Sequence, residues 1–572
     1  MDRPSSSLSN SNPRSWLTDK PVGWLFNAQA GPRHRFIARW TFLRALAAIY
    51  FSAFFSLLFQ IKGLIGPLGI LPAGRYLDAV QGQMGGLRFW FAPTLFWFSA
   101  SSQTMMFVVW MGLAASIAGF CNLWPRLSFL ICFLSFLSFA SAAQDFSNYQ
   151  SDSMLLEAGF LALFFSPRGL LPGLGIASPP PRAGLFLLQW EWFRIYFESG
   201  IVKLLSGDVE WRNFTAMDEY YQNGPLPTWI GWYVEHLPHW FHAATTAGTL
   251  GMELGIVWML FLPKGLRLLC FCIVTPWEIG VILTANYTFL NYLVLALGFL
   301  LLDDRGVHWL LPKSFRAALP IPIKTETATQ IEHSPAITPG VESPATVDQS
   351  MKTAAEGPPV ARKIGVFFLA IRVCLTACIL SWIGYATTAE MIRMPWSDIP
   401  LPTAPVAALE PFRIANQYGL FAVMTRGRYE IEFQGSDDGQ NWTPYLFRYK
   451  PQALNQAPGI YAPYQPRFEW NLWFASLGDW QQNNFVASTE ERLLENDPDV
   501  LALFRENPFA RTPPRYVKAV LWQYWFTSME QKRRTGDWWR RDLIGLYAPI
   551  LTRQPDGKFG VIQWPDPLPP HG

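Results

Sequence analysis

The chain has 572 residues, of which 50% are hydrophobic and only 15% are charged, and its net charge is +3. A soluble protein usually carries about 25% charged residues, so this composition favours a membrane protein with several spans and a sizeable soluble part. The small net charge and the lack of a basic cluster argue against nucleic-acid binding. All 6 cysteines lie in or beside apolar segments, so we expect no disulfide framework.

Two segments have the composition of disordered chain. Residues 1–35 are rich in Ser, Asn and Pro and end in a basic cluster. They lack the apolar core of a cleavable signal, so we interpret them as a disordered cytoplasmic tail. Residues 318–361 are rich in Pro, Thr, Ala and Glu and have almost no aromatic residues, which predicts a disordered linker.

Nine apolar segments are candidate membrane spans, and the two shortest also fit re-entrant or interfacial segments. They lie at 37–59, 103–120, 127–143, 153–165, 184–205, 241–262, 265–284, 288–302 and 364–386. Lys and Arg collect in alternate loops, which predicts a cytoplasmic N-terminus and an exported C-terminal part. We therefore expect a membrane domain over 36–317, a final span over 362–388 and an exported soluble domain over 389–572.

The segment at 184–205 is apolar and aromatic, yet it contains Glu191, Arg194, Glu198 and Lys203. A charge near the middle of a membrane helix costs roughly 2.5–3.5 kcal/mol, so these residues need partners inside a bundle. Glu191, Arg194 and Glu198 share one helix face, and we interpret them as an intramembrane polar cluster that joins helices by ion pairs. For Lys203 the favoured interpretation is a side chain that reaches out to the membrane interface.

From about residue 395 the pattern becomes that of a β-rich α+β domain. Arg428–Gln434 alternates polar and apolar residues and is followed by GSDDGQNW and PYLFRYK, which predicts a hairpin. Phe468–Phe474 alternates large apolar residues as a strand does, whereas Tyr516–Met529 has helical spacing. The turn SDDGQNW resembles one in galactose-binding-like β-sandwiches, which makes that fold one option.

Several blocks of the sequence resemble the lipase maturation factor family. They include WEWFRIYFESGIVKLLSGDVEWRNFTAMDEYYQNGPLPTW, GLIGPLGILPA, SMLLEAGFLALFFSPRG, ILTANYTFLNYL, RIANQYGLFAVMTRGRYEIEFQGSDDG and APYQPRFEWNLWFASL. Carried over position by position, the signature residues are Trp190, Phe193, Gly200, Lys203, Trp211, Thr215, Ala216, Pro225, Pro227, Asn286, Tyr287, Asn416, Tyr418, Gly419, Pro466 and Trp470.

The resemblance implies a multi-pass membrane protein that assists the folding and maturation of secreted lipases or other exported proteins. It would lie in the endoplasmic reticulum membrane of a eukaryote or in the inner membrane of a bacterium. The family implies no catalytic residue and no cofactor. The expected partners are membrane lipids and an exported client protein, with a lipase favoured, and no nucleic acid.

Two other functions stay open at this point. GIVKLLSGDVEW distantly resembles a helix end in vitamin K-dependent γ-carboxylase and the related HTTM membrane proteins. That resemblance implies a membrane enzyme acting on a lipid or quinone-linked substrate with Lys203 as base, and it requires an apolar cavity that reaches Lys203. A transport role would instead use the charged helix as a polar pathway.

Other candidate motifs are weak. His236, His239 and His242 recur at a spacing of three, but they spread over more than one helix face, so we expect no metal site. Asp437 and Asp438 precede a glycine and are typical of a turn rather than a calcium site. The sequence has no GxSxG elbow, HExxH motif, P-loop or dinucleotide fingerprint, which disfavours a conventional hydrolase or nucleotide enzyme.

Overall fold

The computed structural model describes residues 21–147, 149–310, 313–316 and 359–569. The first 20 residues of the predicted tail, and the predicted linker as far as residue 358, lie outside this part. Residues 21–35, which the sequence assigns to the tail, instead form α2 (Pro21–Phe26) and η1 (Ala28–Ala30). Arg182 donates a hydrogen bond to the carbonyl of Ala30 and so holds this segment on the helix bundle.

Six helices in the described residues are long and apolar enough to cross a membrane. They are α3 (Phe36–Ile65), α6 (Ser102–Phe120), α7 (Pro125–Ala142), α13 (His239–Leu254) with η5 (Ile256–Phe261), α14 (Lys264–Thr284) and α19 (Pro359–Arg393). The other three predicted spans are shorter or more polar helices, namely α8 (Gln150–Phe165), α9 (Arg182–Leu205) and α15 (Leu290–Gly298), which η6 (Phe299–Leu301) extends. The count of nine spans is therefore not confirmed.

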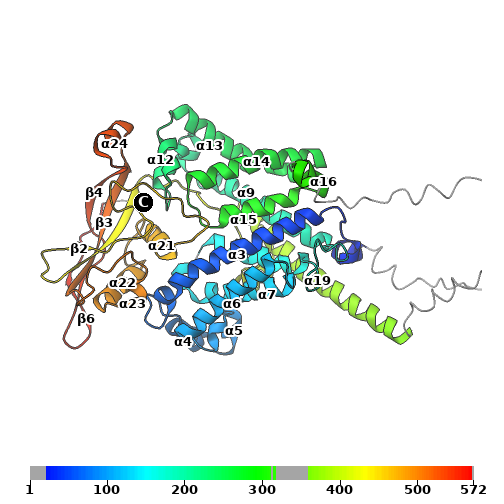
Figure 1. Ribbon diagram of the computed structural model, residues 1–572, viewed down its shortest axis with the longest axis horizontal. Helices are drawn as coiled ribbons and strands as arrows, with labels where there is room; N and C mark the ends of the chain where they lie inside the picture. The colour runs from blue at the N-terminus through cyan, green and yellow to red at the C-terminus, as the bar shows by residue number, and fades with distance from the viewer. Residues whose placement is uncertain (1–20, 148, 311–312, 317–358, 570–572) are drawn as a thin grey trace, which may run out of the picture.

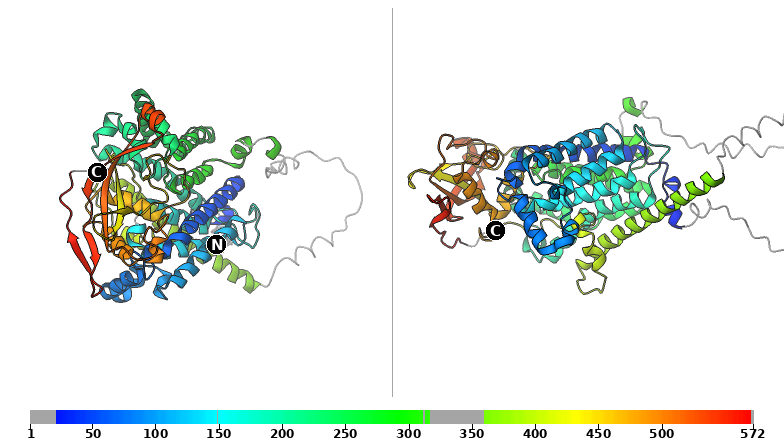
Figure 2. Two further views of the ribbon diagram at one scale, coloured as in Figure 1. Left: turned by 60° about the vertical axis from the view of Figure 1, so that its left-hand side comes forward. Right: turned by 90° about the horizontal axis from the view of Figure 1, so that it is seen from below.

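The helices form one bundle with α9 in its middle, in contact with α8, α13, α15 and α19 (Figure 1). On one side α3 packs against α6, where the ring of Phe54 lies directly on Gly112. A Cβ atom at Gly112 would lie only 2.4 Å from that ring, so this close approach requires glycine. α19 runs along the outside of the bundle, and only 17% of its span is buried (Figures 1 and 2).

Short helices connect the long ones at the two ends of the bundle. Phe89, Trp90 and Phe91 in α5 are exposed, as an interface-lying segment requires. The connecting helices are α4 (Ala73–Met84), η2 (Gly85–Leu87), α5 (Arg88–Phe91), η3 (Leu95–Trp97), η4 (Gln144–Ser147), α10 (Val209–Arg212), α11 (Ala216–Asn223), α12 (Trp229–Glu235), α16 (Asp304–Leu310) and α17 (Lys313–Arg316).

The C-terminal domain is built on an antiparallel sheet with the strand order β2-β1-β3-β5-β6 and with β4 beside β3. The strands are β1 (Arg428–Ser436), β2 (Thr443–Pro444), β3 (Tyr516–Phe526), β4 (Trp539–Leu546), β5 (Ile550–Arg553) and β6 (Phe559–Gln563). The pairing of β1 with β2 confirms the first strand and the turn of the predicted hairpin, but β2 has only 2 residues and the predicted second strand at 444–450 is not formed beyond Pro444. All described strands belong to one sheet, so a galactose-binding-like sandwich is not confirmed.

Two elements of this domain have the opposite type to the predicted one. The predicted strand at 468–474 is the helix α21 (Arg467–Ala475), and the predicted helix at 516–529 is mostly the strand β3. The remaining helices are α20 (Ala404–Ala407), η8 (Glu410–Phe412), α22 (Phe485–Leu494), α23 (Pro498–Leu501) and α24 (Met529–Thr535). Both predictions rested on the spacing of apolar residues. Because α21 and β3 are buried on more than one face, this spacing does not distinguish a helix from a strand there, and both predictions were wrong.

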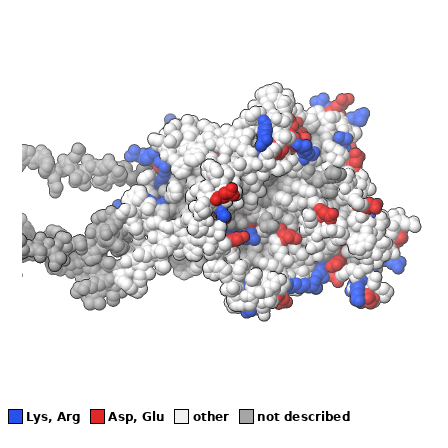
Figure 3. All heavy atoms as spheres, turned by 180° about the vertical axis from the view of Figure 1, so that it is seen from behind, with Lys and Arg blue, Asp and Glu red and all other residues white. Residues whose placement is uncertain are grey.

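The bundle and the C-terminal domain share one buried hydrophobic cluster. The rings of Phe146 and of Phe485 in α22 lie 5.6 Å apart, and Gly63 of α3 lies directly against the backbone of Asp499 in α23. Figure 3 shows charged side chains gathered on the C-terminal domain, with a group of Lys and Arg at the opposite end. Between them, the part of this face next to the Lys and Arg group is uncharged, and scattered acidic and basic side chains begin nearer the C-terminal domain.

Candidate functional site

The charged face of α9 is buried, and two of its three charged side chains have partners on other elements, whereas both carboxylate oxygens of Glu191 have no hydrogen-bond donor among the described residues. Glu191, Arg194 and Glu198 are each 0% exposed. Arg194 forms an ion pair with Glu157 of α8, and Glu198 accepts a hydrogen bond of 2.6 Å from the backbone N–H of Tyr418. These contacts hold α8, α9 and the C-terminal domain together. The cluster is closed to solvent, which argues against a polar transport pathway.

The segment 413–421 of the C-terminal domain lies across α8 and α9. The side-chain amide of Asn416 donates a hydrogen bond of 3.1 Å to Glu157, the carboxylate that also pairs with α9. The backbone N–H of Gly419 donates to the side chain of Gln150 at 2.9 Å. The buried ion pair of the bundle is therefore completed by a segment from the other domain.

Asn286, between α14 and α15, joins one loop from each domain. Its amide nitrogen donates to the carbonyl of Leu226 at 3.1 Å and to that of Gly459 at 2.9 Å. Its amide oxygen accepts from the N–H groups of Tyr461 and Ala462 at 2.7 and 3.0 Å. Both ends of this buried amide are satisfied, so the loops before α12 and before α21 are held at a fixed distance.

Two arginines of the C-terminal domain complete this junction between the domains. Arg467 donates to both carboxylate oxygens of Asp152, at 2.7 and 2.9 Å, and both side chains are 0% exposed. Arg428, at the start of β1, donates to the carbonyls of Gln222 and Pro225 at 3.0 and 3.1 Å. The planar guanidinium suits such paired acceptors. The sequence analysis missed both, because Asp152 and Arg467 are 315 residues apart and no local pattern links them.

The remaining signature residues lie at the same junction or in the elements that build it. The indole N–H of Trp211 donates to the carbonyl of Phe421 at 2.9 Å, and the ring of Trp470 lies against Tyr149 and Tyr287. The others, in α9, in the segment 215–227 or at the start of α21, are Trp190, Phe193, Gly200, Thr215, Ala216, Pro225, Pro227 and Pro466.

Lys203 is buried inside the bundle, and the prediction that it reaches the interface is wrong. Its side chain is 3% exposed. The ammonium donates to Ser199 at 2.9 Å and to the two carboxylate oxygens of Glu253 in α13 at 2.6 and 2.8 Å. The sequence analysis did not single out Glu253, although an acidic residue inside an apolar segment is itself a signal of a buried partner.

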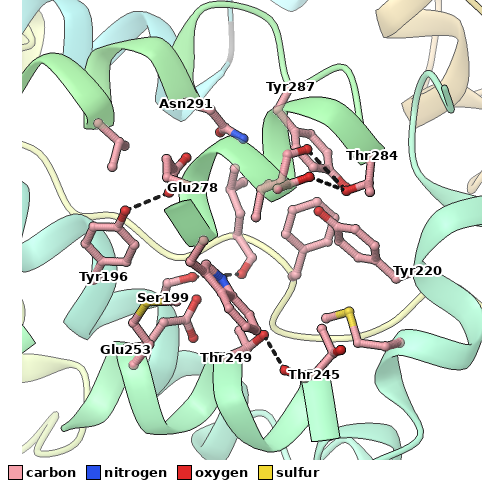
Figure 4. A pocket seen from close by; sticks show the side chains of 18 of the residues that line it. Tyr196, Ser199, Tyr220, Thr245, Thr249, Glu253, Glu278, Thr284, Tyr287 and Asn291 are labelled. Carbon is pink, nitrogen blue, oxygen red and sulfur yellow. Dashed lines mark hydrogen bonds between the residues drawn. The ribbon is translucent and has the colours of Figure 1, made fainter. Parts of the chain in front are cut away.

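A cavity of about 420 Å³ lies beside this ion pair (Figure 4). Residues of α9, α11, α13, α14 and α15 line it, together with Tyr418, Leu420 and Phe421 from the C-terminal domain. Its walls are mainly apolar and aromatic. On the same side of the cavity as Glu253, Tyr196 donates a hydrogen bond of 2.6 Å to Glu278.

This cavity is apolar and reaches Lys203, as the carboxylase hypothesis requires. A general base, however, needs an amine with a free lone pair. Ser199 and Glu253 accept all three hydrogens of the Lys203 ammonium, which leaves no free position on its nitrogen. The contacts of Lys203 thus fit a structural ion pair.

The three histidines of the EHLPHWFH segment do not converge on a common point. His236 lies 3.0 Å from the carbonyl oxygen of Thr527, whereas His239 lies 2.8 Å from Asp218. His242 is buried and contacts a backbone carbonyl of its own loop. These contacts tie the α12–α13 corner to neighbouring segments.

Asp438 organises the turn after β1. Its carboxylate accepts hydrogen bonds from the N–H groups of Asn441 and Gln440, at 2.7 and 2.8 Å. These bonds hold the pKa of Asp438 below its usual range. Asp438 thus has the turn-forming role that the sequence indicates.

A bundle of membrane-capable helices joined by buried ion pairs to a domain with an antiparallel sheet defines a multi-pass membrane protein with a C-terminal sheet domain. Residues 37–309 match the family model described as lipase maturation factor transmembrane domain, and residues 414–549 match lipase maturation factor C-terminal domain. The chain belongs to the lipase maturation factor family.

Individual relatives match over most of their length. Lipase maturation factor 2 of Gallus gallus is 32% identical, with 89% of this chain and 81% of the relative covered. Lipase maturation factor 2 of Homo sapiens is 31% identical, with 90% and 83% covered. Lipase maturation factor 1 of Bos taurus is 29% identical, with 93% and 92% covered. No solved structure matches, and none of these relatives carries the name of a carboxylase, so that hypothesis has no support.

Proposed function

We propose that this chain assists the maturation of a lipase, as the names of its relatives state for them. The observation that carries the proposal is the extent of the similarity, which covers about nine-tenths of the chain and includes both domains. A folding factor needs a surface for its client and a support that holds the surface in place. The buried junction around Asn286 and Arg467 provides such a support.

The charge distribution supports an exported C-terminal domain. The bundle end that carries α2, α17 and the start of α19 lies opposite the sheet (Figure 1). Lys264 and Arg267 lie in the first turn of α14 at this end, and Lys313 and Arg316 lie in α17. Lys and Arg are enriched on the cytoplasmic side of membrane proteins. The sheet would then face the lumen of the endoplasmic reticulum in a eukaryote, or the periplasm in a bacterium.

The edge strand β6 is the surface that suits an unfinished client. β6 pairs only with β5 among the described strands, and it lies at the end of the sheet far from the bundle (Figure 1). Ile562 and Trp564 are 57% and 62% exposed, and Leu543 of β4 is 56% exposed. A partly folded lipase offers unpaired strand edges and apolar side chains, which bind to such an edge. This surface would act as a chaperone contact.

The test is a lipase secretion assay in cells that lack their own maturation factor. The cells would express a secreted lipase with the full chain, or with an Ile562→Lys/Trp564→Ala variant. We expect the full chain to raise the lipase activity per secreted molecule and the double variant to lose most of this gain. Trp396→Ala is the matched control, because Trp396 is also 62% exposed but follows the end of α19.

The outcomes separate two claims. If lipase activity per molecule is the same with and without the full chain, the maturation role is wrong. If the full chain works and the β6 variant works equally well, only the proposed contact surface is wrong.

A further inference from the structure

The cavity between α13 and α14 contains a buried carboxyl group that has no cationic partner among the described residues. Its lining contains Lys203, Glu253 and Glu278. Lys203 and Glu253 neutralise each other. In the described part of the chain, Glu278 forms no ion pair with Lys, Arg or His, and its hydrogen bond comes from the neutral hydroxyl of Tyr196. A buried carboxylate in apolar surroundings is stabilised by a cation that comes from outside.

A second polar group in the same wall has no partner. The side-chain nitrogen of Asn291 is buried without a hydrogen-bond acceptor in the described residues. Asn291 as a whole is only 8% exposed. Figure 4 shows its amide directed into the cavity, between Glu278 and Tyr287. Because an unsatisfied buried donor is unfavourable, this amide indicates a ligand that also carries a hydrogen-bond acceptor.

The rest of the wall suits a cation and an apolar chain. Nine aromatic side chains line the cavity, among them Tyr196, Trp211, Tyr220, Trp277 and Tyr287. Aromatic faces attract ammonium groups, and several of them around one carboxylate form a typical ammonium site. The volume of about 420 Å³ falls within the roughly 300–1,000 Å³ of small-molecule sites.

The cavity is reached from the lipid-facing side of the bundle. Of the span in α14 only 22% is buried, and of the span in α13 and η5 only 28%, so both helices face outward. Gly280 lines the cavity, is exposed, and has open space where a side chain would lie. Thr284, at the end of α14 nearest the C-terminal domain, also lines it, which places the cavity near the headgroups of that leaflet.

We propose that this cavity binds an amphiphile from the membrane whose head carries an ammonium group, with Glu278 as the ion-pair partner and Asn291 as the hydrogen-bond donor. The ammonium lies at Glu278, and the apolar part follows the aromatic wall on the side of Tyr220 and Thr245. This site is separate from the client surface at β6. A test of ligand binding in this cavity therefore does not depend on the maturation role.

The experiment uses the purified full chain in mild detergent and three palmitoyl-length photo-crosslinking probes. One probe is a lysophosphatidylethanolamine, one is a long-chain amino alcohol, and one is a fatty acid. We expect the two ammonium probes to label α13 and the second half of α14, and the fatty acid to label them weakly. The first two probes separate a phospholipid source from a sphingoid one.

Three variants make the result specific. Glu278→Gln removes the charge, and we expect at least about tenfold weaker labelling by the ammonium probes, with no change for the fatty acid. Asn291→Asp adds a carboxylate and should increase the preference for ammonium over fatty acid. Gly280→Trp should block all labelling at the cavity, whereas Gly265→Trp, at an equally open position of α14 outside the cavity, should not.

The proposal is overturned if the fatty acid labels the cavity as strongly as the ammonium probes. It is also overturned if labelling is unchanged in both Glu278→Gln and Gly280→Trp. Thermal unfolding of each variant shows whether it is folded. If Glu278→Gln does not fold, the ratio of ammonium-probe labelling to fatty-acid labelling in Asn291→Asp decides. A higher ratio than in the original chain supports the proposal, and an equal or lower ratio overturns it.

Discussion

At the residue scale, the contact between Arg467 and Asp152 is the clearest determinant of stability. Both side chains are 0% exposed and share two hydrogen bonds. We predict that Arg467→Met lowers the free energy of unfolding by about 3–5 kcal/mol, because Asp152 then stays buried without a cationic partner and keeps only the hydroxyl of Ser147. Thermal unfolding in detergent measures this loss. A second change, Asp152→Leu, should recover much of the stability, since the unpaired charge is then removed.

The control for this prediction is an ion pair at the surface. Lys558 lies 3.8 Å from Asp556 in the turn before β6, and their side chains are 82% and 53% exposed. We expect Lys558→Met to change the free energy of unfolding by about 0–1 kcal/mol. If Arg467→Met changes stability as little as Lys558→Met does, the pair with Asp152 does not hold the domains together.

Glu235 gives a prediction about pH. It ends α12, in the segment that connects α9 to α13, outside the membrane-spanning helices. Burial, and then the nearby carboxylates of Glu219 and Asp218, raise its pKa to about 8 from an ordinary value of 4.5. The folded state therefore binds more protons than the unfolded state between these values, so the contribution of Glu235 to stability falls as pH rises from about 4.5 to about 8.

The variant Glu235→Gln tests this sign. The amide cannot ionise, so we expect the variant to lose less stability than the original chain between pH 5 and pH 8. Its melting temperature should equal or exceed that of the original chain at pH 8. Melting curves at a series of pH values measure this difference. Parallel curves for the two proteins would contradict the assignment of a raised pKa to Glu235.

At the element scale, the sequence predicts elements well where only one face is buried. β1 and the turn after it follow from alternation and from the Asp/Gly residues, as found. In α21, 8 of the 9 residues are buried, including Arg467 and Glu469, so polar residues do not mark an outer face. β3 pairs on both sides with other strands and is covered on parts of both faces. Tertiary packing, which a local pattern does not contain, decides the type of such elements.

Close packing of two helices gives a prediction at this scale. A Cβ atom at Gly200 of α9 would lie 2.9 Å from Glu253 and from Leu254 of α13. We predict that Gly200→Ala moves α13 and lowers the free energy of unfolding by about 1–3 kcal/mol. A Cβ atom at Gly251 of α13 would instead have no neighbouring atom within 4 Å, so Gly251→Ala should be neutral or stabilising. Equal melting temperatures for the two variants would show that α9 and α13 are not in such close contact.

At the scale of the whole molecule, the sequence indicates a helical membrane domain followed by a β-rich domain, but not how they join. The signature residues Asn286, Asn416 and Gly419 come from the family resemblance, and only the structure shows that they meet at one junction. Partners of buried charges can lie anywhere along a chain. The charged residues within α9 indicate that such partners exist. That the partners are Glu157 and Glu253 follows only from the packing of the helices.

The junction predicts that the bundle and the C-terminal domain unfold together. We expect a single thermal transition for the full chain, because buried ion pairs and one hydrophobic cluster cross the boundary. A chain that ends at Arg393 lacks Arg467 and the N–H of Tyr418, so Asp152 and Glu198 lose their partners. This truncated chain should therefore melt at a lower temperature than the full one, as calorimetry would measure.

The substitution Asp152→Asn makes this prediction decisive, because its effect should change sign between the two chains. In the full chain it leaves the charge of Arg467 buried without its partner and lowers the melting temperature. In the truncated chain it removes an unpaired charge and raises the melting temperature. Two separate transitions in the full chain, or the same sign of effect in both chains, would mean that the domains are only loosely attached. A tight attachment implies that a force applied to the sheet is transmitted to the membrane helices and is not absorbed by a hinge.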